Sequence, residues 1–123
     1  MYAFLESAAR DRNPCITVNP TAFRDYCHVD DVVQAALAAL ERNANGVFNI
    51  GSGTPTTLLE LAECCLSAAG SSRQPEVKHQ ADTYSMLLAI ERAGSELGYR
   101  PRVTLAEGVK REYERLYSST LPG

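Results

Sequence analysis

The stretch that most constrains the fold of this chain is Arg24–Asp31, RDYCHVDD, which leads directly into an apolar series at helical spacing. Its first part has the aromatic and β-branched character of a strand. Asp30 or Asp31 is expected to supply a carboxylate N-cap to the helix that follows. The helical positions are Val32, Val33, Ala36, Leu37 and Leu40. The pattern therefore predicts an extended segment that turns sharply into a helix ending near Arg42.

Arg24 lies on the strand side of this junction. A guanidinium carries five donors in a fixed geometry, so at the mouth of such a turn it is well suited to binding a phosphate or a carboxylate. The alternative is that Arg24 pairs with Asp25 or with a neighbouring acid on the surface. The residue pattern leaves both interpretations open.

Length and charge restrict the class of protein. The 123 residues suit one domain, 1–123, carry a net charge of -3, and have their twelve Lys and Arg scattered along the chain. A nucleic acid or an anionic membrane favours a basic stripe, so neither is expected as a partner. There is no apolar run of about eighteen residues and no charged-then-apolar start. We therefore expect a cytoplasmic protein.

The cysteines indicate neither a metal site nor a disulfide. Cys15, Cys27, Cys64 and Cys65 lack the CxxC and paired His spacings that zinc requires. The adjacent pair falls in a helical pattern, where successive side chains point in different directions. All four are expected to be reduced thiols, mostly buried, and no metal site is predicted.

Helices and strands alternate in the predicted secondary structure. Helices are predicted over residues 2–9, 31–42, 57–69, 86–97 and 104–117, and strands over residues 15–18, 47–50 and 75–80. Thr57 with Glu60, and Thr104 with Glu107, match the capping box at a helix start. Residues 47–50, VFNI, are expected to form a buried parallel strand. This order of elements predicts an α/β layer arrangement with about five helices.

Four stretches of the chain carry a family resemblance. They are RDYCHVDDV at 24–32, VFNIGSG at 47–53, ELA at 60–62, and LGYRP followed by LAEGV between 97 and 109. In this order they resemble the C-terminal part of NAD-dependent nucleotide-sugar epimerases and dehydratases, in the extended short-chain dehydrogenase/reductase family. The resemblance implies the small substrate-binding part of such a protein, about its last third, with the N-terminal Rossmann half absent.

The sequence lacks the parts that carry out this family's chemistry. Gly51 and Gly53 follow a predicted strand, but no third glycine completes a GxxGxxG dinucleotide fingerprint. No tyrosine has a lysine four residues later, so the Tyr-x-x-x-Lys acid–base pair is missing. His28 is a lone histidine and is expected to be structural. We therefore expect no catalytic residue and no cofactor in this chain, although NAD is the cofactor of the family.

The resemblance assigns substrate-binding roles to five residues. Arg24 matches the arginine that contacts the diphosphate of a nucleotide-diphosphate sugar. Ile16 and Val18 match an edge strand whose backbone meets the nucleotide base. His79, or Lys78 with a shift of one residue, stands where a second phosphate-binding residue lies. Neither side chain can donate two parallel hydrogen bonds to a phosphate as well as the arginine found there in the family.

Two functions remain open at this point. The chain is expected to be the nucleotide-sugar-binding portion of an NAD-dependent epimerase or dehydratase, without catalysis by itself. The alternative is a non-catalytic binding or oligomerisation module derived from that family. The strand predicted at residues 47–50 would leave an apolar edge open, and open edges find partners. We therefore expect a homodimer or a complex with a separate chain that bears the Rossmann half.

Overall fold

Short strands and five helices alternate along residues 1–118, the part of the chain that the computed structural model describes, apart from the side chains of His79 and Gln80. The expected α/β class with about five helices is confirmed. None of the described helices is long and apolar enough to span a membrane. The helices are α1 (Tyr2–Ala9), α2 (Val29–Glu41), α3 (Leu58–Ala68), the π-helical turn η1 (Ala93–Leu97) and α4 (Leu105–Tyr117).

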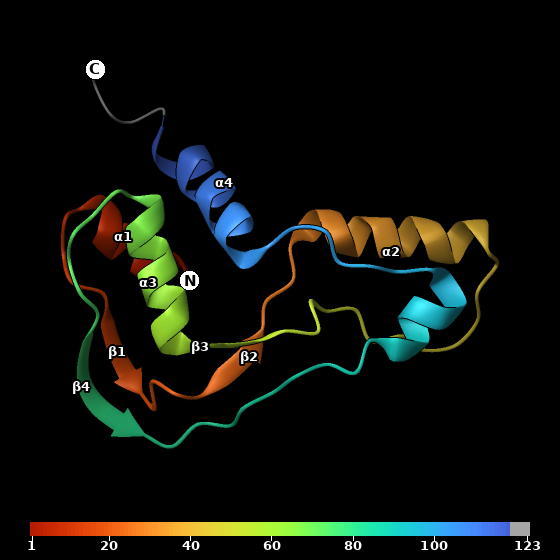
Figure 1. Ribbon diagram of the computed structural model, residues 1–123, viewed down its shortest axis with the longest axis horizontal. Coiled ribbons are helices and arrows are strands. Elements are labelled where there is room, and N and C mark those ends of the chain that lie inside the picture. Colours follow the sequence, from red (N-terminus) through yellow and green to blue (C-terminus); the bar gives the residue numbers. More distant parts are fainter. Residues whose placement is uncertain (119–123) are drawn as a thin grey trace.

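The described strands form two small sheets (Figure 1). In the first sheet β1 pairs in parallel with β4, with Ile16 opposite Val77 and a register shift before Val18. In the second, β2 pairs antiparallel with β3, and Arg24 lies opposite Thr56. The strands are β1 (Cys15–Val18), β2 (Phe23–Asp25), β3 (Pro55–Thr57) and β4 (Glu76–Ala81).

The larger core joins α1, α3 and α4. Its buried residues are Leu5, Leu61, Cys65 and Val109. The predicted capping box starts α3, since the Glu60 N–H donates to Thr57 Oγ1 at 3.1 Å and the Thr57 N–H donates to Glu60 Oε2 at 2.7 Å. Because each side chain satisfies a backbone donor of the first turn, the helix begins where the sequence predicts.

A second core lies between α2 and η1, at the end of the molecule away from β1 and β4 (Figure 1). Ala35 of α2 packs with Ala93, Leu97 and Tyr99. Gly98 closes η1 with a φ of 68°, the left-handed conformation expected for a glycine at a helix end. The valines and leucines of α2 lie outside this contact and are exposed.

The strand predicted at residues 47–50 is wrong: this segment has no regular structure, and Val47 is exposed. A strand forms only where a neighbour supplies hydrogen bonds. Among the described residues no strand lies beside this segment. The apolar composition of residues 47–50 indicates a preference for burial. It does not show which neighbour would bury them.

The helix predicted over residues 86–97 is wrong in its first part, because helical structure begins at Glu91. The Met86 N–H donates to the Phe23 carbonyl at 3.0 Å, and the Leu88 N–H donates to Asp25 Oδ2 at 3.4 Å. These backbone donors are therefore used by β2 and not by a preceding helical turn. The helix begins only where this contact with β2 has ended.

Candidate functional site

Arg24 lies in the short strand β2 and is held by the segment that follows β4. Its Nη1 donates to the Phe23 carbonyl at 2.9 Å and also to the Tyr84 carbonyl, and its Nη2 donates to Thr83 Oγ1 at 3.0 Å. Its Cζ also lies 4.2 Å from the centre of the Tyr84 ring. The interpretation that Arg24 pairs with Asp25 is wrong, since the described partners of Arg24 are carbonyls, a hydroxyl and a ring.

These contacts leave part of the Arg24 guanidinium for a ligand. Of its five N–H groups, the two on Nη1 and one on Nη2 are used in the described contacts. The Nε–H and the second Nη2–H have no partner among the described residues. Arg24 is half-buried. Its plane is thus fixed while two donors stay available for an oxyanion.

Asp25, the next residue, holds the turn at residues 51–53. Its Oδ1 accepts the N–H and the hydroxyl of Ser52, both at 2.6 Å, and its Oδ2 accepts the Gly53 N–H at 3.0 Å. A Cβ at Gly51 would come within 2.5 Å of Asp25 Oδ2, so only glycine fits there. Asp25 therefore has a structural role.

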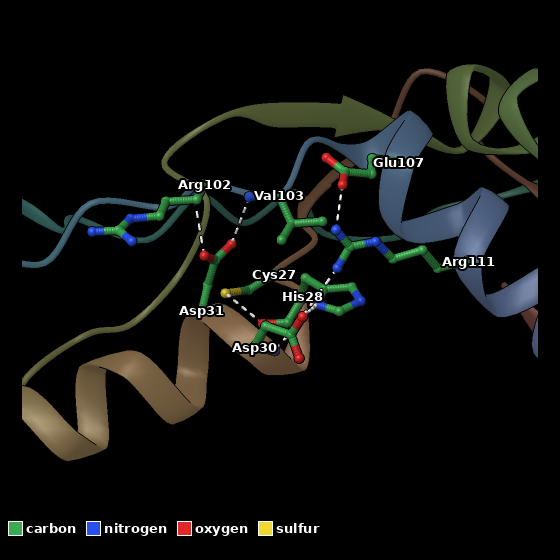
Figure 2. A network of polar contacts seen from close by, with 8 residues as sticks. All are labelled: Cys27, His28, Asp30, Asp31, Arg102, Val103, Glu107 and Arg111. Atoms are coloured by element: carbon green, nitrogen blue, oxygen red, sulfur yellow. Dashed lines mark hydrogen bonds and ion pairs between the residues drawn. The ribbon is translucent and has the colours of Figure 1, made fainter.

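Helix α2 begins with a histidine cap (Figure 2). His28 Nδ1 accepts the Asp30 N–H at 3.1 Å, so the expected carboxylate cap from Asp30 or Asp31 is wrong. The Asp30 carboxylate instead pairs with Arg111 at 3.0 Å. Because His28 fills the cap position, the histidine has the structural role that the sequence predicts.

Asp31 ties α2 to the segment before α4, as Figure 2 shows. Its carboxylate is 3% exposed and accepts the N–H groups of Arg102 at 2.9 Å and Val103 at 3.2 Å. A buried carboxylate is stable only when such donors surround it. Asp31 therefore positions the segment from which α4 starts.

Tyr99 joins the same junction from the end of η1. Its hydroxyl donates to the Gly51 carbonyl at 2.7 Å and lies 3.5 Å from Cys27 Sγ. Burial, assisted by the contact with Cys27, raises the pKa of Tyr99 above its usual value, and burial also raises the pKa of Cys27. Both groups stay protonated at neutral pH and serve as packing and hydrogen-bonding groups.

The other predicted site residues lie on the sheet of β1 and β4. Ile16 is buried, Val18 is half-buried, and Lys78 is exposed with its Nζ 3.4 Å from Glu76 Oε2. His79 lies within β4, but its side chain is outside the described set. The structure thus places Ile16, Val18 and Lys78 on one sheet, and Arg24 against the residues just after β4.

Sequence reasoning missed Thr83 and Tyr84, which hold Arg24. They lie about sixty positions away in the sequence. Neither belongs to a motif, and the predicted helix began shortly after them. The contact is seen only in the folded chain, where this segment lies beside β2, so no signal in the sequence could have found it.

Two cavities of about 240 and 270 Å³ lie at the start of α4. Arg24, Ile16, Val18 and Lys78 line neither of them. Both cavities are bordered by Tyr26 and residues 103–105. These four predicted site residues therefore lie outside both cavities. The described residues contain no group of His, Cys, Asp and Glu side chains arranged to hold a metal ion.

Comparisons with known proteins agree with the arrangement of these elements. Residues 1–51 match the NAD dependent epimerase/dehydratase family. A UDP-glucose 4-epimerase of Corynebacterium glutamicum is 34% identical over 93 residues, which are 72% of this chain and 28% of that protein. A putative UDP-glucose 4-epimerase of Methanocaldococcus jannaschii is 31% identical over 110 residues, 88% of this chain and 35% of that protein.

A solved structure shows the same fold over almost the whole chain. The UDP-glucose 4-epimerase of Thermotoga maritima, crystallised with UDP-glucose, has a TM-score of 0.84 and 34% identity. The comparison covers 96% of this chain but 39% of that protein. The chain thus spans between about a quarter and two fifths of the length of these similar proteins.

Proposed function

Because this chain belongs to the NAD-dependent epimerase/dehydratase family, we propose that it is the nucleotide-diphosphate-sugar-binding part of such an enzyme. In this proposal residues 1–123 form a single domain, act in the cytoplasm and do not catalyse a reaction alone. The observation that carries it concerns Arg24: Thr83 and Tyr84 fix its guanidinium, and two of its donors have no partner among the described residues.

Each proposed site residue has a definite task. The two remaining donors of Arg24 bind oxygens of the diphosphate. A planar guanidinium held in place is well suited to charge-assisted hydrogen bonds with a phosphate. Strand β1, with Ile16 and Val18, pairs with β4 on one edge and offers the backbone groups of its other edge to the base. Lys78 or His79 supplies a second positive charge to the phosphates.

The turn at residues 51–53 does not fit a dinucleotide. A pyrophosphate is held by free backbone N–H groups at a glycine-rich turn. Here the N–H groups of Ser52 and Gly53 donate to Asp25, whose negative charge also repels a phosphate. This supports the proposal that NAD, the cofactor in the family's description, is not held at this turn, and we derive no step through it.

A second candidate function is a non-catalytic assembly module derived from the same family. The exposed valines and leucines of α2 favour it, since such a surface is typical of a protein–protein contact. In this reading the chain associates with a second copy or with a separate chain. Nucleotide-sugar binding and association are compatible with each other.

Calorimetry with UDP-glucose and with NAD tests the binding proposal. We expect weak binding of UDP-glucose that falls about 10–100-fold in Arg24→Ala, because a hydrogen bond to a charged group contributes about 1.5–3 kcal/mol. Arg115→Ala, which changes an exposed arginine on α4, is the matched control and should bind as the parent does. NAD should give no binding heat.

Two results would contradict the proposal. One is binding of NAD as tight as that of UDP-glucose. The other is a UDP-glucose affinity that is the same in Arg24→Ala and in the parent chain. Circular dichroism of both variants verifies that the comparison is made between folded proteins.

A further inference from the structure

His28 lies where the start of α2 meets α4 (Figure 2). A Cβ at Gly108 of α4 would come within 3.1 Å of His28 Cδ2, so the ring rests on that helix at its glycine. The His28 side chain is 20% exposed and borders the cavity of about 240 Å³ at the start of α4. The ring is therefore held between two helices and is still within reach of a proton from solvent.

One ring nitrogen of His28 carries the cap of α2. The N–H groups of Asp31 and Val32 donate to the His28 carbonyl at 3.1 and 3.3 Å. The Asp30 N–H has only His28 Nδ1, at 3.1 Å, as a partner among the described residues. A neutral imidazole accepts through one nitrogen and donates through the other. Because Nδ1 accepts, the ring proton of the capping form lies on Nε2.

A solvent proton and the Asp30 N–H compete for the same lone pair on Nδ1. Histidine is the side chain that changes its charge between pH 5 and 8, and a protonated ring has two donors and no acceptor. Protonation would thus point the Nδ1–H at the Asp30 N–H. It would also place a positive charge at the N-terminus of a helix, where the helix dipole disfavours it. The cap therefore exists only while His28 is neutral.

The Asp30 carboxylate is the partner that a protonated His28 can use instead. Its Oδ2 lies 3.5 Å from His28 Nδ1 and pairs with Arg111 at 3.0 Å. Arg111 also pairs with Glu107, so it keeps a partner if Asp30 turns toward the histidine. One proton can thus exchange a backbone cap for an ion pair between side chains.

Glu112 is an acid that faces His28 from α4. Hydrogen bonding to Arg115 lowers the pKa of Glu112 to about 2, and the charge of His28 makes a smaller contribution. Tyr2 of α1 donates to the same carboxylate at 2.9 Å. Glu112 therefore stays ionised throughout the range in which a histidine titrates, and its charge is constant there.

Three further titratable groups lie near the ring, on Met1, Tyr26 and Cys27. Burial raises the pKa of Tyr26 and of Cys27, so both stay uncharged at neutral pH. Met1, which carries the amino group of the chain, borders the same cavity from the start of α1. Any effect of this amino group persists when His28 is replaced, so variants of His28 separate the two.

We propose that His28 is a pH-sensitive cap, which joins α2 to α4 while it is neutral and releases the first turn of α2 when it binds a proton. The release reaches further than the cap, because Asp31 lies in the same turn and accepts the N–H groups of Arg102 and Val103. Loosening that turn therefore also loosens the segment from which α4 starts. This inference does not depend on nucleotide-sugar binding.

Amide hydrogen exchange, followed by NMR between pH 8 and pH 5, tests the cap. Protection is expressed relative to an unstructured peptide at the same pH, which removes the pH dependence of exchange itself. We expect protection of the Asp30 amide to fall about 3–30-fold on acidification, since the loss of a cap changes the stability of a helix start by about that factor. Amides of α3 should keep their protection.

Variants at the two histidines make the test specific. His28→Asn replaces the ring with a cap that does not titrate, so the Asp30 amide should be protected at both ends of the pH range. His28→Ala has no cap and should show low protection at both. His79→Asn removes the other histidine of the chain and should keep the pH response of the parent.

Two results would overturn the inference. The first is a nitrogen NMR spectrum at pH 8 that places the ring proton of neutral His28 on Nδ1, because such a ring cannot accept the Asp30 N–H. The second is an equal pH dependence of the Asp30 amide in the parent and in His28→Asn, with α3 protected in both. A loss of UDP-glucose binding would contradict the binding proposal and leave this result unchanged.

Discussion

Asp25 Oδ1 accepts both the backbone N–H and the hydroxyl of Ser52 at 2.6 Å. The same carboxylate also accepts the Gly53 N–H at 3.0 Å and the Leu88 N–H at 3.4 Å. One side chain of β2 therefore holds two segments that are far away in the sequence. Because Arg24 is the preceding residue, its position depends on this anchor.

We predict that Asp25→Asn lowers the free energy of unfolding by about 1–3 kcal/mol. The amide places an N–H₂ group where a carboxylate oxygen accepts a donor, and a partly buried donor left without an acceptor costs about 1–3 kcal/mol. Urea unfolding measures the change. Asp30→Asn is the control, since Asp30 is an exposed partner of Arg111 and should cost at most about 1 kcal/mol. Equal losses in the two variants would contradict the anchor role.

Tyr84 is predicted to act on nucleotide binding through Arg24. Its ring lies 4.2 Å from the Arg24 Cζ, and such a contact contributes about 0.5–2 kcal/mol. If the proposed function holds, Tyr84→Ala should weaken UDP-glucose binding about 3–10-fold because the guanidinium loses its fixed plane. Tyr84→Phe keeps the ring and should bind as the parent does. Tighter binding by Tyr84→Ala would show that the ring covers the arginine instead of positioning it.

The parts of the fold that the sequence predicts are those that depend on neighbours along the chain. Thr57 and Glu60 form their capping box within one helical turn, and Gly98 ends η1 by its own conformational freedom. The spacing of Leu61 and Cys65 is likewise enough to identify the buried side of α3. Each of these signals lies within a few residues and needs no distant partner.

The parts that the sequence does not predict depend on distant partners. His28 caps α2, whereas Asp31, one of the two predicted caps, accepts the N–H groups of Arg102 and Val103. Residues 86–90 are not helical because β2 takes their backbone donors. For the candidate site, the family resemblance predicts Arg24 as a binding residue. Its contacts with residues 83–84 are seen only in the folded chain, where the segment after β4 lies beside β2.

Acid unfolding should depend on Glu112. Hydrogen bonding to Arg115, with help from Tyr2, lowers the pKa of Glu112 from its ordinary 4.5 to about 2 in the folded chain. A carboxylate with a lowered folded pKa contributes stability that is present above its unfolded pKa and is lost as the pH falls through its folded pKa. The loss therefore belongs to the window between pH 4.5 and about pH 2.

The measurement is the slope of stability against pH in that window. Glu112→Gln should lower stability at pH 7 and show a flatter decline toward pH 2, because its side chain no longer titrates. Glu63→Gln, a change of an exposed glutamate on α3, is the matched substitution and should keep the parent's slope. If Glu112→Gln kept the parent's full slope, other carboxylates would account for the loss of stability at low pH.

The adjacent cysteines Cys64 and Cys65 should differ in reactivity. All four cysteines of the chain are free, but Cys65 is fully buried in the core of α1, α3 and α4, whereas Cys64 is half-buried. Burial raises the pKa of Cys65 to about 12, and it also raises the pKa of Cys64. Alkylation requires the thiolate, so both burial and pKa protect Cys65.

We predict that iodoacetamide at pH 8 labels Cys64 at least ten times faster than Cys65 in the folded chain. Mass spectrometry of proteolytic fragments from Cys64→Ser and Cys65→Ser variants separates the two positions. In urea the remaining cysteine of each variant should react at a similar rate, because unfolding removes the burial that raises the two pKa values. Fast labelling of Cys65 in the folded chain would mean that α3 opens readily. Such opening would be inconsistent with the packing of Leu5, Leu61 and Val109 around it.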